Sequence, residues 1–435
     1  MIVSTTWAGQ RFAVLGLARS GMATVRALAA AGAHVVAWDS DGEARKAATG
    51  IDGVIVHDPA LLDLTGAAAL IVSPGVPLNT HPLVAAAREA GVRVIGDIEL
   101  FAQARGALPP HRVVGITGTN GKSTTTALVH HILQTAGVPT LMGGNIGLPI
   151  LGQEPLMPND AGPGVYVLEL SSYQIDLTET LDCDVAVLLN ITPDHLDRYD
   201  GFEAYAASKA RLFAMQSPAH DAVIGIGDAP SAQIARSLSG RGEHLTKIAP
   251  GVCMDQSRWP ALQGPHNAQN TLAAIAAVKA LGIADADIDR ALASFAGLPH
   301  RMATVAVLNG VTFVDDSKAT NPESAAPALG AFERIHWIVG GKRKGDDLYA
   351  CAPYFDRIAA AYTIGEAGPL FHDLLKDRLP RVEQSGDLTT AVAHAAAAAR
   401  PGEVVLLSPA CASFDQFRDY EDRGAAFMAA VEALK

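Results

Sequence analysis

The sequence predicts an α/β protein with three domains in series. Short apolar runs of strand length alternate with longer stretches of helical spacing along most of the chain. At roughly 100–200 residues per domain, a chain of 435 residues has room for three such units. Glycine and proline gather at 106–111 and again at 297–301, as they do in connecting segments. We therefore expect domains at 1–108, 109–299 and 300–435.

The overall composition narrows the classes of ligand. Apolar residues make up 49% of the chain and charged residues 18%, so each domain can bury a core. The formal net charge is −12, which argues against a general nucleic-acid binder because such proteins need a basic surface. A small anionic ligand is not excluded, since a few local cations and backbone amides are enough to hold one.

Cysteine usage and hydropathy indicate a cytoplasmic protein. The four cysteines lie far apart and form no CxxC pair, so neither a disulfide framework nor a zinc site is expected. The first residues lack the basic-then-apolar order of a secretory signal. The uncharged, apolar stretch at 69–87 contains three prolines and is not expected to span a membrane. We expect a soluble monomer that binds small molecules, and neither nucleic acid nor a membrane.

The first unit opens with a βαβ pattern. An apolar run at 11–16 is typical of a strand, residues 20–32 have helical character, and 34–39 indicate a second strand that ends in Asp39. The turn "GLARSG" resembles a dinucleotide-binding turn, but Ala18 replaces the middle glycine that would admit a pyrophosphate. NAD is therefore disfavoured, while a nucleotide-sugar diphosphate on the same turn stays open.

The second unit carries the sharpest motif, "GTNGKSTTT" at 118–126. It follows the strand-like run 112–117 and opens a stretch of helical spacing at 122–137. Glycines let backbone amides surround a phosphate, Lys122 can reach the outer phosphates, and the Ser123 hydroxyl can bind Mg²⁺. The match to the P-loop pattern is incomplete, because that pattern needs glycine where Ile116 stands. A nucleotide-triphosphate site is the favoured interpretation.

Two further strand ends of this unit carry polar residues. Glu169 ends the buried run 165–170 and is a candidate Mg²⁺ ligand or base, because strand ends of a parallel sheet face the ligand crevice. His195 follows the run 185–190 and is a candidate metal or phosphate ligand. Lys209 lies in a helical stretch and, from the residues alone, is an ordinary solvated lysine.

The last unit has three polar loops, each after a strand. They are "DDSKATNPES" at 315–324, "GGKRKGDD" at 340–347 and "SPACASFDQF" at 408–417. Each contains cations, hydroxyls or a helix start, which are suited to carboxylates. These loops indicate that the last unit captures a small acidic substrate. Cys411 lies in one of them and is expected to be a buried small residue rather than a nucleophile.

Taken together, these motifs resemble the Mur ligase family of bacterial peptidoglycan precursor synthesis. The stretches that carry the resemblance run in order as "GTNGKSTTT", "GGNIGLP", "LELSSYQ", "NITPDHLDRY", "GPHNAQN", "GLPHR", "DSKATN" and "LLSPACASFDQF". The resemblance implies a Rossmann-like N-terminal domain for a UDP-linked substrate, a central P-loop ATPase domain, and a Rossmann-like C-terminal domain for an amino acid. It covers nearly the whole chain, most loosely at the N-terminus.

Within the family, the pattern is similar to that of the ligases that add D-glutamate to UDP-N-acetylmuramoyl-L-alanine. The "DNPR" stretch of the siblings that add a diaminoacid is absent from this chain. The implied reaction uses ATP to make an acyl phosphate, which the amine of D-glutamate attacks. Its place would be cell-wall biogenesis, and through it cell shape and division.

The resemblance also implies roles for individual residues. ATP would be held by Gly118, Thr119, Asn120, Gly121, Lys122, Ser123, Thr124, Asn270 and Arg301. Ser123 and Glu169 would bind one Mg²⁺, and His195 would bind a second Mg²⁺ together with Lys209, whose counterpart in the family is carbamylated. The implied catalytic residues are Lys122, His195 and Lys209. The UDP-substrate would contact Leu15, Ala18, Asp39, Ser40, Ser73, Gly75 and Asn145. D-Glutamate would contact Lys318, Thr320, Lys344, Ser413 and Phe414, with Lys342 as the alternative to Lys344.

Three other functions stay open at this point. A folylpolyglutamate synthase shares the ATPase core and adds glutamate, but it would not need the first nucleotide-binding domain. A non-catalytic nucleotide switch would need neither the amino-acid pocket nor a second metal. An oxidoreductase using the first domain is weakened by Ala18.

Overall fold

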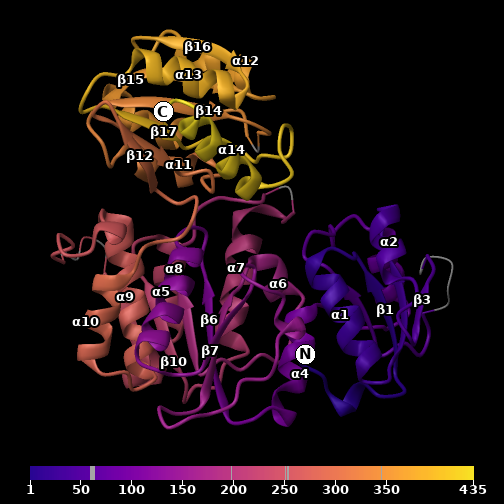
Figure 1. The fold of residues 1–435 in the computed structure, drawn as a ribbon. Coiled ribbons are helices and arrows are strands. Elements are labelled where there is room, and N and C mark those ends of the chain that lie inside the picture. The colour runs from indigo at the N-terminus through magenta and orange to yellow at the C-terminus, as the bar shows by residue number, and fades with distance from the viewer. Residues whose placement is uncertain (59–63, 197, 250, 252–253, 344) are drawn as a thin grey trace. The chain divides into compact units, whose positions relative to one another are not determined.

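The computed structural model contains three sheets that follow one another along the chain (Figure 1). It describes residues 1–58, 64–196, 198–249, 251, 254–343 and 345–435. The chain divides into two units: the first comprises 1–255 and 267–295, and the second comprises 256–266 and 296–435. The first unit holds two sheets and the second unit holds one. The predicted α/β class is therefore confirmed.

The first sheet is parallel, with the strand order β3-β2-β1-β4-β5. Its strands are β1 (Arg11–Leu15), β2 (His34–Trp38), β3 (Val54–Val56), β4 (Ala69–Val72) and β5 (Val94–Ile95). Its helices are α1 (Arg19–Ala30), α2 (Gly42–Ala48), α3 (Pro82–Glu89) and α4 (Asp97–Ala104), with short 3₁₀ turns η1 (Thr5–Trp7) and η3 (Arg105–Ala107). Strand β1 lies between β2 and β4, so the turn after β1 is at the point where the chain changes direction across the sheet.

The second sheet is also parallel, with the order β11-β10-β9-β6-β8-β7. Its strands are β6 (His111–Thr117), β7 (Thr140–Gly144), β8 (Gly164–Glu169), β9 (Val185–Leu188), β10 (Asp221–Gly225) and β11 (Leu245–Ile248). Strand β6 lies between β8 and β9. The segment expected to be a linker, 106–111, overlaps η3 and the first residue of β6.

Helices cover both faces of the second sheet. They are α5 (Lys122–Thr135), α6 (Ser172–Asp176), α7 (Gly201–Ala214), α8 (Ala229–Ser237), α9 (Pro265–Ala280) and α10 (Asp285–Ser294), with 3₁₀ turns η4 (Ile150–Gly152) and η5 (Ser239–His244). The 3₁₀ turn η6 (Pro260–Leu262) belongs to the second unit. Figure 1 shows β6 between α5 on one side and α6 and α7 on the other. Because both faces are covered, β8 and β9 are buried along their whole length rather than at alternate residues.

The third sheet is mixed, with the order β12-β13-β17-β14-β15-β16. Its strands are β12 (Ala303–Leu308), β13 (Val311–Asp315), β14 (Ile335–Gly340), β15 (Ile358–Ile364), β16 (Val382–Gly386) and β17 (Val404–Leu407). Strands β12 and β13 form an antiparallel hairpin, and the other pairings are parallel. Strand β12 was not anticipated from the sequence.

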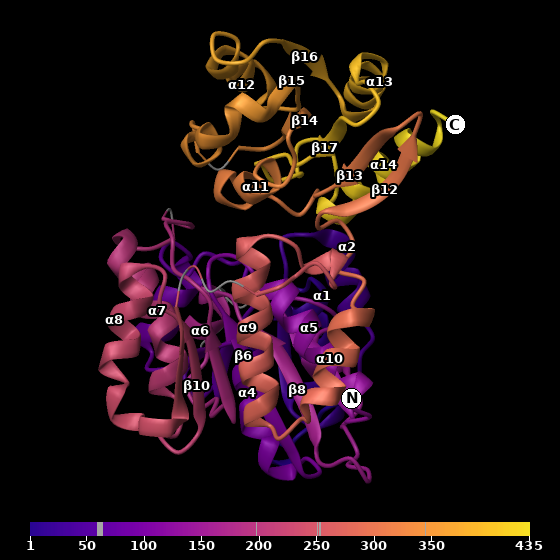
Figure 2. The same cartoon turned by 90° about the vertical axis from the view of Figure 1, so that its left-hand side faces the viewer.

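Two pairs of helices sandwich the third sheet, as Figure 2 shows. They are α11 (Pro322–Leu329) and α12 (Gly368–Leu375) with the 3₁₀ stretch η7 (Tyr349–Arg357) on one face, and α13 (Leu388–Ala398) and α14 (Tyr420–Glu432) on the other. Along β14, Trp337 and Val339 pack into one core and Ile338 packs into the other, as the two-residue period of a strand requires.

Side-chain caps start several helices. Asn321, Asp387 and Asp419 accept hydrogen bonds from backbone amides three residues further on, at 2.8, 2.9 and 2.8 Å. Pro322 occupies the first turn of α11, where its missing amide hydrogen costs nothing. The "DSKATNPES" segment thus turns into a helix at the residue its sequence indicates.

Candidate active site

The polar loops predicted from the sequence follow the central strands of the three sheets. In each sheet, one such strand lies between two others that also end in a polar loop. This middle strand is β1 in the first sheet, β6 in the second and β17 in the third. In parallel sheets the carboxyl ends of such strands open a crevice for ligands.

The phosphate loop between β6 and α5 needs glycine at two positions. Gly121 caps α5 with φ +85°, and a Cβ there would lie 2.2 Å from Asn270 Oδ1. Gly118 has φ +151°, and a Cβ there would lie 3.1 Å from Leu189 Cβ. An L side chain is thus strained at Gly121 both by backbone conformation and by space. This places Asn270, which is buried, against the loop that its predicted role requires.

A neighbouring loop fixes the conformation of the phosphate loop. Asn190 accepts from the amide of Thr119 at its carbonyl and from the amide of Asn120 at Oδ1, both at 2.9 Å. Thr119 Oγ1 donates to the carbonyl of Thr192 across 3.0 Å. The sequence analysis did not single out Asn190 or Thr192. Their position just after β9, at the sheet edge where the glycine-rich loop also lies, could have indicated a role in holding that loop.

Two lysines meet at the carbonyl of Gly118. Lys122 Nζ donates to Gly118 O across 2.9 Å and to Thr119 O across 2.7 Å. Lys209 Nζ, from α7, donates to the same Gly118 oxygen across 2.9 Å and lies 4.7 Å from the ring centre of Tyr205. The lysine that the residues alone marked as solvated is therefore buried against the phosphate loop, because α7 packs its inner face there.

The environment of Lys209 favours a neutral amine. Only 1% of the residue is exposed. Burial lowers the pKa of Lys209 well below its ordinary value, and the charge of Lys122 acts in the same direction. Three carboxylates oppose the shift: Asp194, Asp176 and Glu169. An unprotonated amine is the form that reacts with CO₂, so the site can supply the chemistry of a lysine carbamate.

Glu169 and Asn145 come together at the ends of β8 and β7. Asn145 Nδ2 donates to Glu169 Oε1 across 3.1 Å, and the Asn145 amide donates to the Glu169 carbonyl across 2.8 Å. Glu169 is 2% exposed, and Ser123, in the first turn of α5, is 2% exposed. Asn145 was predicted as a contact of the UDP-substrate, and it thus lies beside a predicted metal ligand.

His195 has a left-handed backbone, with φ +55°. This conformation is costly for a residue other than glycine and often marks a functional site. The amide of His195 donates a hydrogen bond to Asp194 Oδ1 across 2.9 Å. The imidazole lies 5.0 Å from the ring of Tyr173 and 6.4 Å from the ring of Tyr205. His195 is thus held by its own loop and by two aromatic rings.

The donor set of this region suits a magnesium ion held partly by its nucleotide. Among the described residues, no group of three or more His, Cys, Asp and Glu side chains is arranged for a metal. Mg²⁺ usually takes one or two carboxylates and completes its shell with phosphate and water oxygens. A buried carboxylate at Glu169 and a hydroxyl at Ser123 fit that pattern, and a carbamate on Lys209 would add oxygen ligands.

In the first sheet, the turn after β1 is closed by Ser73. Ser73 Oγ donates to Gly16 O across 2.9 Å, and a Cβ on Gly16, whose φ is +91°, would lie 2.8 Å from Ser73 Cβ. A Cβ on Gly21 would lie 1.8 Å from Gly16 O. Gly21, rather than the replaced middle glycine at Ala18, is therefore where the close approach of helix and strand occurs.

The other residues predicted for the UDP-substrate surround this turn. Asp39 Oδ2 accepts from the amide of Leu17 across 2.6 Å, while Ala18 precedes the first residue of α1. Ser40 and Gly75 are exposed. The side chain of Leu15 packs in an apolar core, so only its backbone borders the turn.

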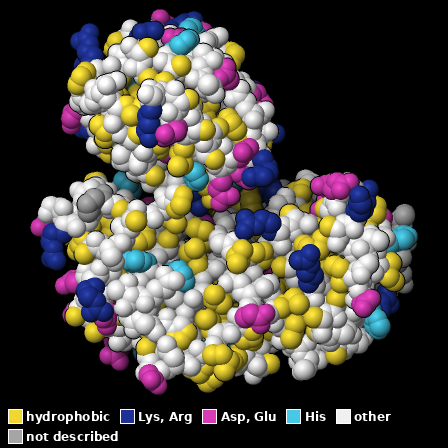
Figure 3. All heavy atoms as spheres, in the orientation of Figure 1, with side chains coloured by type: hydrophobic (Ala, Val, Ile, Leu, Met, Phe, Trp, Pro, Cys, Tyr) yellow, Lys and Arg dark blue, Asp and Glu magenta, His cyan; other side chains and the backbone are white. Residues whose placement is uncertain are grey.

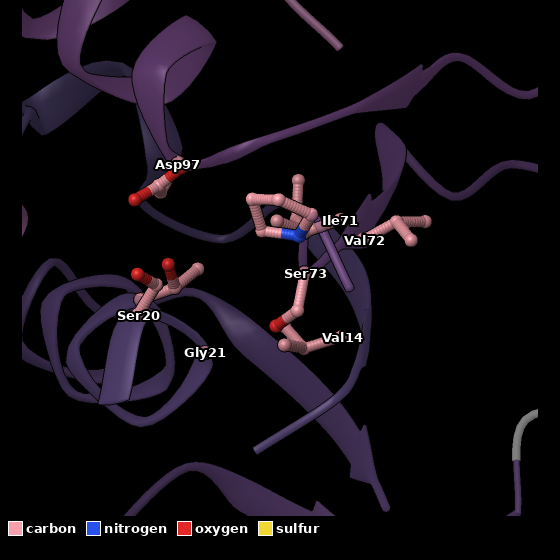
Figure 4. A pocket seen from close by; sticks show the side chains of 9 residues that line it. Val14, Ser20, Gly21, Ile71, Val72, Ser73 and Asp97 are labelled. Atoms are coloured by element: carbon pink, nitrogen blue, oxygen red, sulfur yellow. The ribbon is translucent and has the colours of Figure 1, made fainter. Parts of the chain in front are cut away.

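A small cavity adjoins this turn, with a volume of about 10 Å³ (Figure 4). Ser73 lines it, and Asp97 and Ser20 face one another across it. Asp97 Oδ2 and Thr24 Oγ1 are buried without a hydrogen-bond partner among the described residues. Burial raises the pKa of Asp97 to about 6, against amide hydrogens of Ile98 and Asp97 and the Ser20 hydroxyl. The sequence analysis missed Asp97, which looks like an ordinary acidic residue in a first helical turn.

In the third sheet, a buried arginine joins two of the three predicted loops. Arg423, from α14, donates to Ser317 O across 2.7 Å and to the carbonyls of Cys411 and Ala412 across 3.0 and 3.2 Å. Ser408 Oγ donates to Asp316 Oδ2 across 2.7 Å. Arg423 was also missed, since nothing in the sequence distinguishes it from a surface helix residue.

The residues predicted for D-glutamate occupy these loops to different degrees. Lys318 lies with its Nζ 5.0 Å from the ring centre of Tyr420. Ser413 is 2% exposed, whereas Phe414 is 68% exposed. Thr320 is half-buried just before α11.

Of the two alternative lysines in the loop after β14, only Lys342 is among the described residues. Lys344 lies outside them. Lys342 pairs with Ala412 through reciprocal backbone hydrogen bonds of 2.8 and 2.9 Å, so its backbone lies next to Ser413.

Arg301 belongs to the second unit, close to two buried titratable groups. Burial lowers the pKa of His266 to about 4, and the positive charge of Arg301 contributes to this shift. Burial raises the pKa of Asp316 to about 7, and Arg301 acts against that rise. Its neighbour His300 has φ +60° and lies 2.6 Å from Asp315 through Nδ1. The "GLPHR" segment is thus anchored to the loop that follows β13.

Two surface properties complete the description. In the described part of the chain, no helix is both long enough and apolar enough to cross a bilayer. On the face drawn in Figure 3, positive and negative side chains are scattered among apolar and uncharged ones.

Three family models match the chain, one for each sheet. They are described as "Mur ligase MurD-like, N-terminal domain" over residues 10–96, "Mur ligase middle domain" over 116–249 and "Mur ligase, glutamate ligase domain" over 300–411. The first match argues against the folate interpretation, which has no use for a domain of that kind.

Curated relatives match the full length. A UDP-N-acetylmuramoylalanine--D-glutamate ligase of Novosphingobium aromaticivorans is 62% identical over 436 residues, covering 100% of this chain and 97% of that protein. A protein of the same name from Sphingopyxis alaskensis is 60% identical over 441 residues and is covered completely, as is this chain.

Solved structures share the fold at low identity. The MurF ligase from Thermotoga maritima in complex with ADP has a TM-score of 0.62 at 16% identity, covering 98% of this chain and 96% of that chain. The UDP-N-acetylmuramate-alanine ligase MurC of the same organism has a TM-score of 0.61 at 17% identity, covering 98% and 100%.

Proposed function

The chain belongs to the Mur ligase family, and from that premise we propose that it joins D-glutamate to UDP-N-acetylmuramoyl-L-alanine with consumption of ATP. The observation that carries the proposal is full-length identity of 62% to a relative named as the D-glutamate ligase. The reaction serves peptidoglycan precursor synthesis, which locates the protein in the cytoplasm. We take the protein to act as a monomer with domains at 1–108, 109–299 and 300–435.

The chemistry begins with activation of a carboxylate. The carboxylate of the alanyl group takes the γ-phosphoryl group of ATP, giving an acyl phosphate and ADP. The amine of D-glutamate attacks the acyl carbon, and phosphate leaves as the amide forms. The protein's part in such phosphoryl and acyl transfers is mainly alignment and neutralisation of charge.

The phosphate loop is assigned to ATP. Backbone amides of Gly118–Thr124 surround the phosphates, and Lys122, now bonded to two loop carbonyls, turns to the β- and γ-phosphates. Asn270 contacts the nucleotide beside Gly121, and Arg301 is also assigned to the nucleotide.

One Mg²⁺ is assigned to Ser123 and Glu169, and a second to His195 and a carbamate on Lys209. When bound, these ions would neutralise phosphate charge and polarise the transferring group. Glu169 supplies a buried carboxylate, while Asn145 orients it and contacts the substrate next to the reacting group. In its unprotonated form, the amine of Lys209 would add CO₂ and release a proton, which would leave an anionic carbamate at the second metal site; the lowered pKa of Lys209 favours that form.

The two other substrates occupy the first and third sheets. The turn of Ala18, Asp39, Ser40, Ser73 and Gly75 takes the UDP part, and Leu15 supports it through its backbone. Lys318, Thr320, Ser413 and Phe414 surround D-glutamate together with Lys342 or Lys344. Cations and hydroxyls in these loops match a ligand with two carboxylates.

Phosphate release tests this function. The purified chain is given ATP, Mg²⁺ and UDP-N-acetylmuramoyl-L-alanine with D-glutamate, L-glutamate or meso-diaminopimelate. We expect D-glutamate to stimulate release and to appear in the UDP-linked product by mass spectrometry. Stimulation by L-glutamate or the diaminoacid, but not by D-glutamate, would refute the assignment. Lys122→Ala serves as the control, because it removes the phosphate contact and leaves the UDP turn intact.

A further inference from the structure

Arg198 holds the loop that follows β4 through three carbonyl groups. Its guanidinium donates to Val76 O across 2.7 Å, to Gly75 O across 3.3 Å and to Pro74 O across 3.4 Å. Arg198 lies three residues after His195, and its own amide donates to the His195 carbonyl across 2.9 Å. One side chain thus connects the loop of a proposed metal ligand to the loop proposed for the UDP-substrate.

The opposite side of the same guanidinium rests on an aromatic cluster. Arg198 Cζ lies 4.4 Å from the ring centre of Tyr173, and that ring is 5.0 Å from the imidazole of His195. The imidazole is 6.4 Å from the ring of Tyr205, whose hydroxyl is 3.1 Å from Thr119 Oγ1 in the phosphate loop. A continuous chain of contacts therefore connects residues 74–76, after β4, to the phosphate loop.

The chemistry of this contact requires arginine. A guanidinium presents five N–H donors in a rigid planar fork and a flat face for stacking. It can therefore bond several carbonyls at its edge while its face lies on Tyr173. A lysine ammonium would keep the charge, but it has no flat face and three donors around one atom. The two proline residues of the segment 73–77 leave few amide donors, so its carbonyls are the groups available for the contact.

We propose that Arg198 is a positioning residue which makes binding of the UDP-substrate and binding of the nucleotide favour one another. A substrate seated on Ser73 and Gly75 fixes the carbonyls that Arg198 bonds. The fixed guanidinium holds Tyr173 and His195 in the arrangement that favours the nucleotide and its metal. This inference rests on the proposed function, and it adds a linkage between two sites of that function.

The coupling is measured by a thermodynamic cycle. The dissociation constant of a non-hydrolysable ATP analogue with Mg²⁺ is determined by calorimetry with and without UDP-N-acetylmuramoyl-L-alanine. We expect the second ligand to tighten the first by about fivefold or more in the unaltered chain, and the reverse experiment to give the same factor. We expect Arg198→Lys and Arg198→Ala to bring the factor to within about twofold of one.

Two further variants guard against trivial explanations. Arg211→Lys is the matched control, because Arg211 also bonds a backbone carbonyl, Thr178 O at 2.9 Å, but does not reach 73–77. It should keep the full coupling. Tyr173→Leu removes the stacking face and leaves the fork of Arg198 in place, and it should also lose coupling. Thermal melting checks that each variant is folded.

The outcomes separate this inference from the function beneath it. Coupling that survives in both Arg198 variants overturns the inference. An equal loss of UDP-substrate affinity with and without nucleotide also overturns it, because Arg198 would then be a direct ligand. If the unaltered chain releases phosphate with D-glutamate but shows no coupling, the function stands and the inference fails. If the chain does not bind the UDP-substrate at all, both fail.

Discussion

The amine of Lys209 and the amine of Lys122 donate to one oxygen, the carbonyl of Gly118, each across 2.9 Å. Two cations at one acceptor repel each other, and one of them is fully enclosed. Burial, together with the charge of Lys122, lowers the pKa of Lys209 well below its ordinary value. Of the two amines, Lys209 is thus the one whose surroundings favour loss of a proton.

Replacing Lys209 by methionine should stabilise the chain at neutral pH while abolishing activity. The pKa of the buried amine is lower in the folded state than in the unfolded state, so the unfolded state binds more protons. Stability of the unaltered chain therefore rises with pH until the ordinary lysine pKa is passed. Lys122 still donates to Gly118 in the variant. In CO₂-free, metal-free buffer, Lys209→Met should have a higher melting temperature than the unaltered chain at pH 7. This difference should become smaller as the pH is raised to 10.

The same amine should carry a carbamate when CO₂ is supplied. With ¹³C-labelled bicarbonate, we expect one carbamate resonance in the ¹³C spectrum that Lys209→Met lacks. Exhaustive removal of CO₂ should lower activity, and bicarbonate should restore it. Lys279→Met is a suitable control, because Lys279 is exposed and pairs with Asp285 across 2.8 Å. A resonance that persists in Lys209→Met would contradict the assignment.

Gly121→Ala should cost more stability than Gly137→Ala, although both glycines have positive φ. The φ angles are +85° and +75°, so both variants pay the left-handed strain of about 1–2 kcal/mol. Only the Cβ at Gly121 meets another atom, Asn270 Oδ1 at 2.2 Å, whereas nothing lies within 4 Å at Gly137. Urea unfolding should therefore rank Gly121→Ala as the less stable variant, and it should also weaken nucleotide binding.

A double variant isolates the collision from the strain. Adding Asn270→Ala to Gly121→Ala removes the atom that the new Cβ meets. The double variant should then lose less stability than the sum of the two single variants, since the sites are in contact. Strict additivity would show that Asn270 moves away without cost.

The strand ends were the part of the site that could be predicted from residues alone. Glu169 and His195 follow apolar runs, and the topology brings such ends to one edge of a parallel sheet. Lys122 is part of a local motif whose conformation is set by its own glycines. For these residues, local sequence and general topology carry enough information.

Residues whose role depends on packing were not visible in the sequence. Lys209 and Arg423 are buried charged residues on helices, and their burial is decided by which helix face meets the sheet. Lys209 was found only through the family resemblance, and Arg423 was not found. Asp97 looks like a first-turn acid, and its enclosure depends on residues distant in sequence, such as Ser20 and Ser73, which line the same cavity. Sequence periodicity indicates which face is apolar, but not where a single polar group is enclosed.

Lys318→Met should weaken binding of D-glutamate with little effect on the other substrates. The change keeps the length of the side chain and removes a cation from a loop assigned to two carboxylates. A charge-assisted hydrogen bond contributes about 1.5–3 kcal/mol, so KM for D-glutamate should rise roughly 10- to 100-fold. Steady-state kinetics at saturating ATP and UDP-substrate measures this change. An unchanged KM for D-glutamate would remove Lys318 from the pocket.

Asp97→Asn should stabilise the chain above pH 6 and have no effect on stability below about pH 4. Burial raises the folded pKa of Asp97 from 3.8 to about 6, so the folded state holds its proton more tightly than the unfolded state does. Above the folded pKa the carboxylate is charged in both states, and the folded state bears a penalty of roughly 3 kcal/mol. As the pH is lowered from about 6 to 3.8, this penalty decreases. Below 3.8 it vanishes, because Asp97 is protonated in both the folded and the unfolded state.

Paired urea titrations from pH 4 to pH 8 measure the difference between variant and unaltered chain, which cancels the titration of other groups. Asparagine keeps an oxygen to accept the 3.0 Å hydrogen bond from the amide of Ile98. Asp52→Asn, at an exposed turn, is the control and should show no such trend. If Asp97→Asn were equally destabilising at every pH, the prediction would fail. The folded pKa of Asp97 would then not be raised by burial beside the cavity.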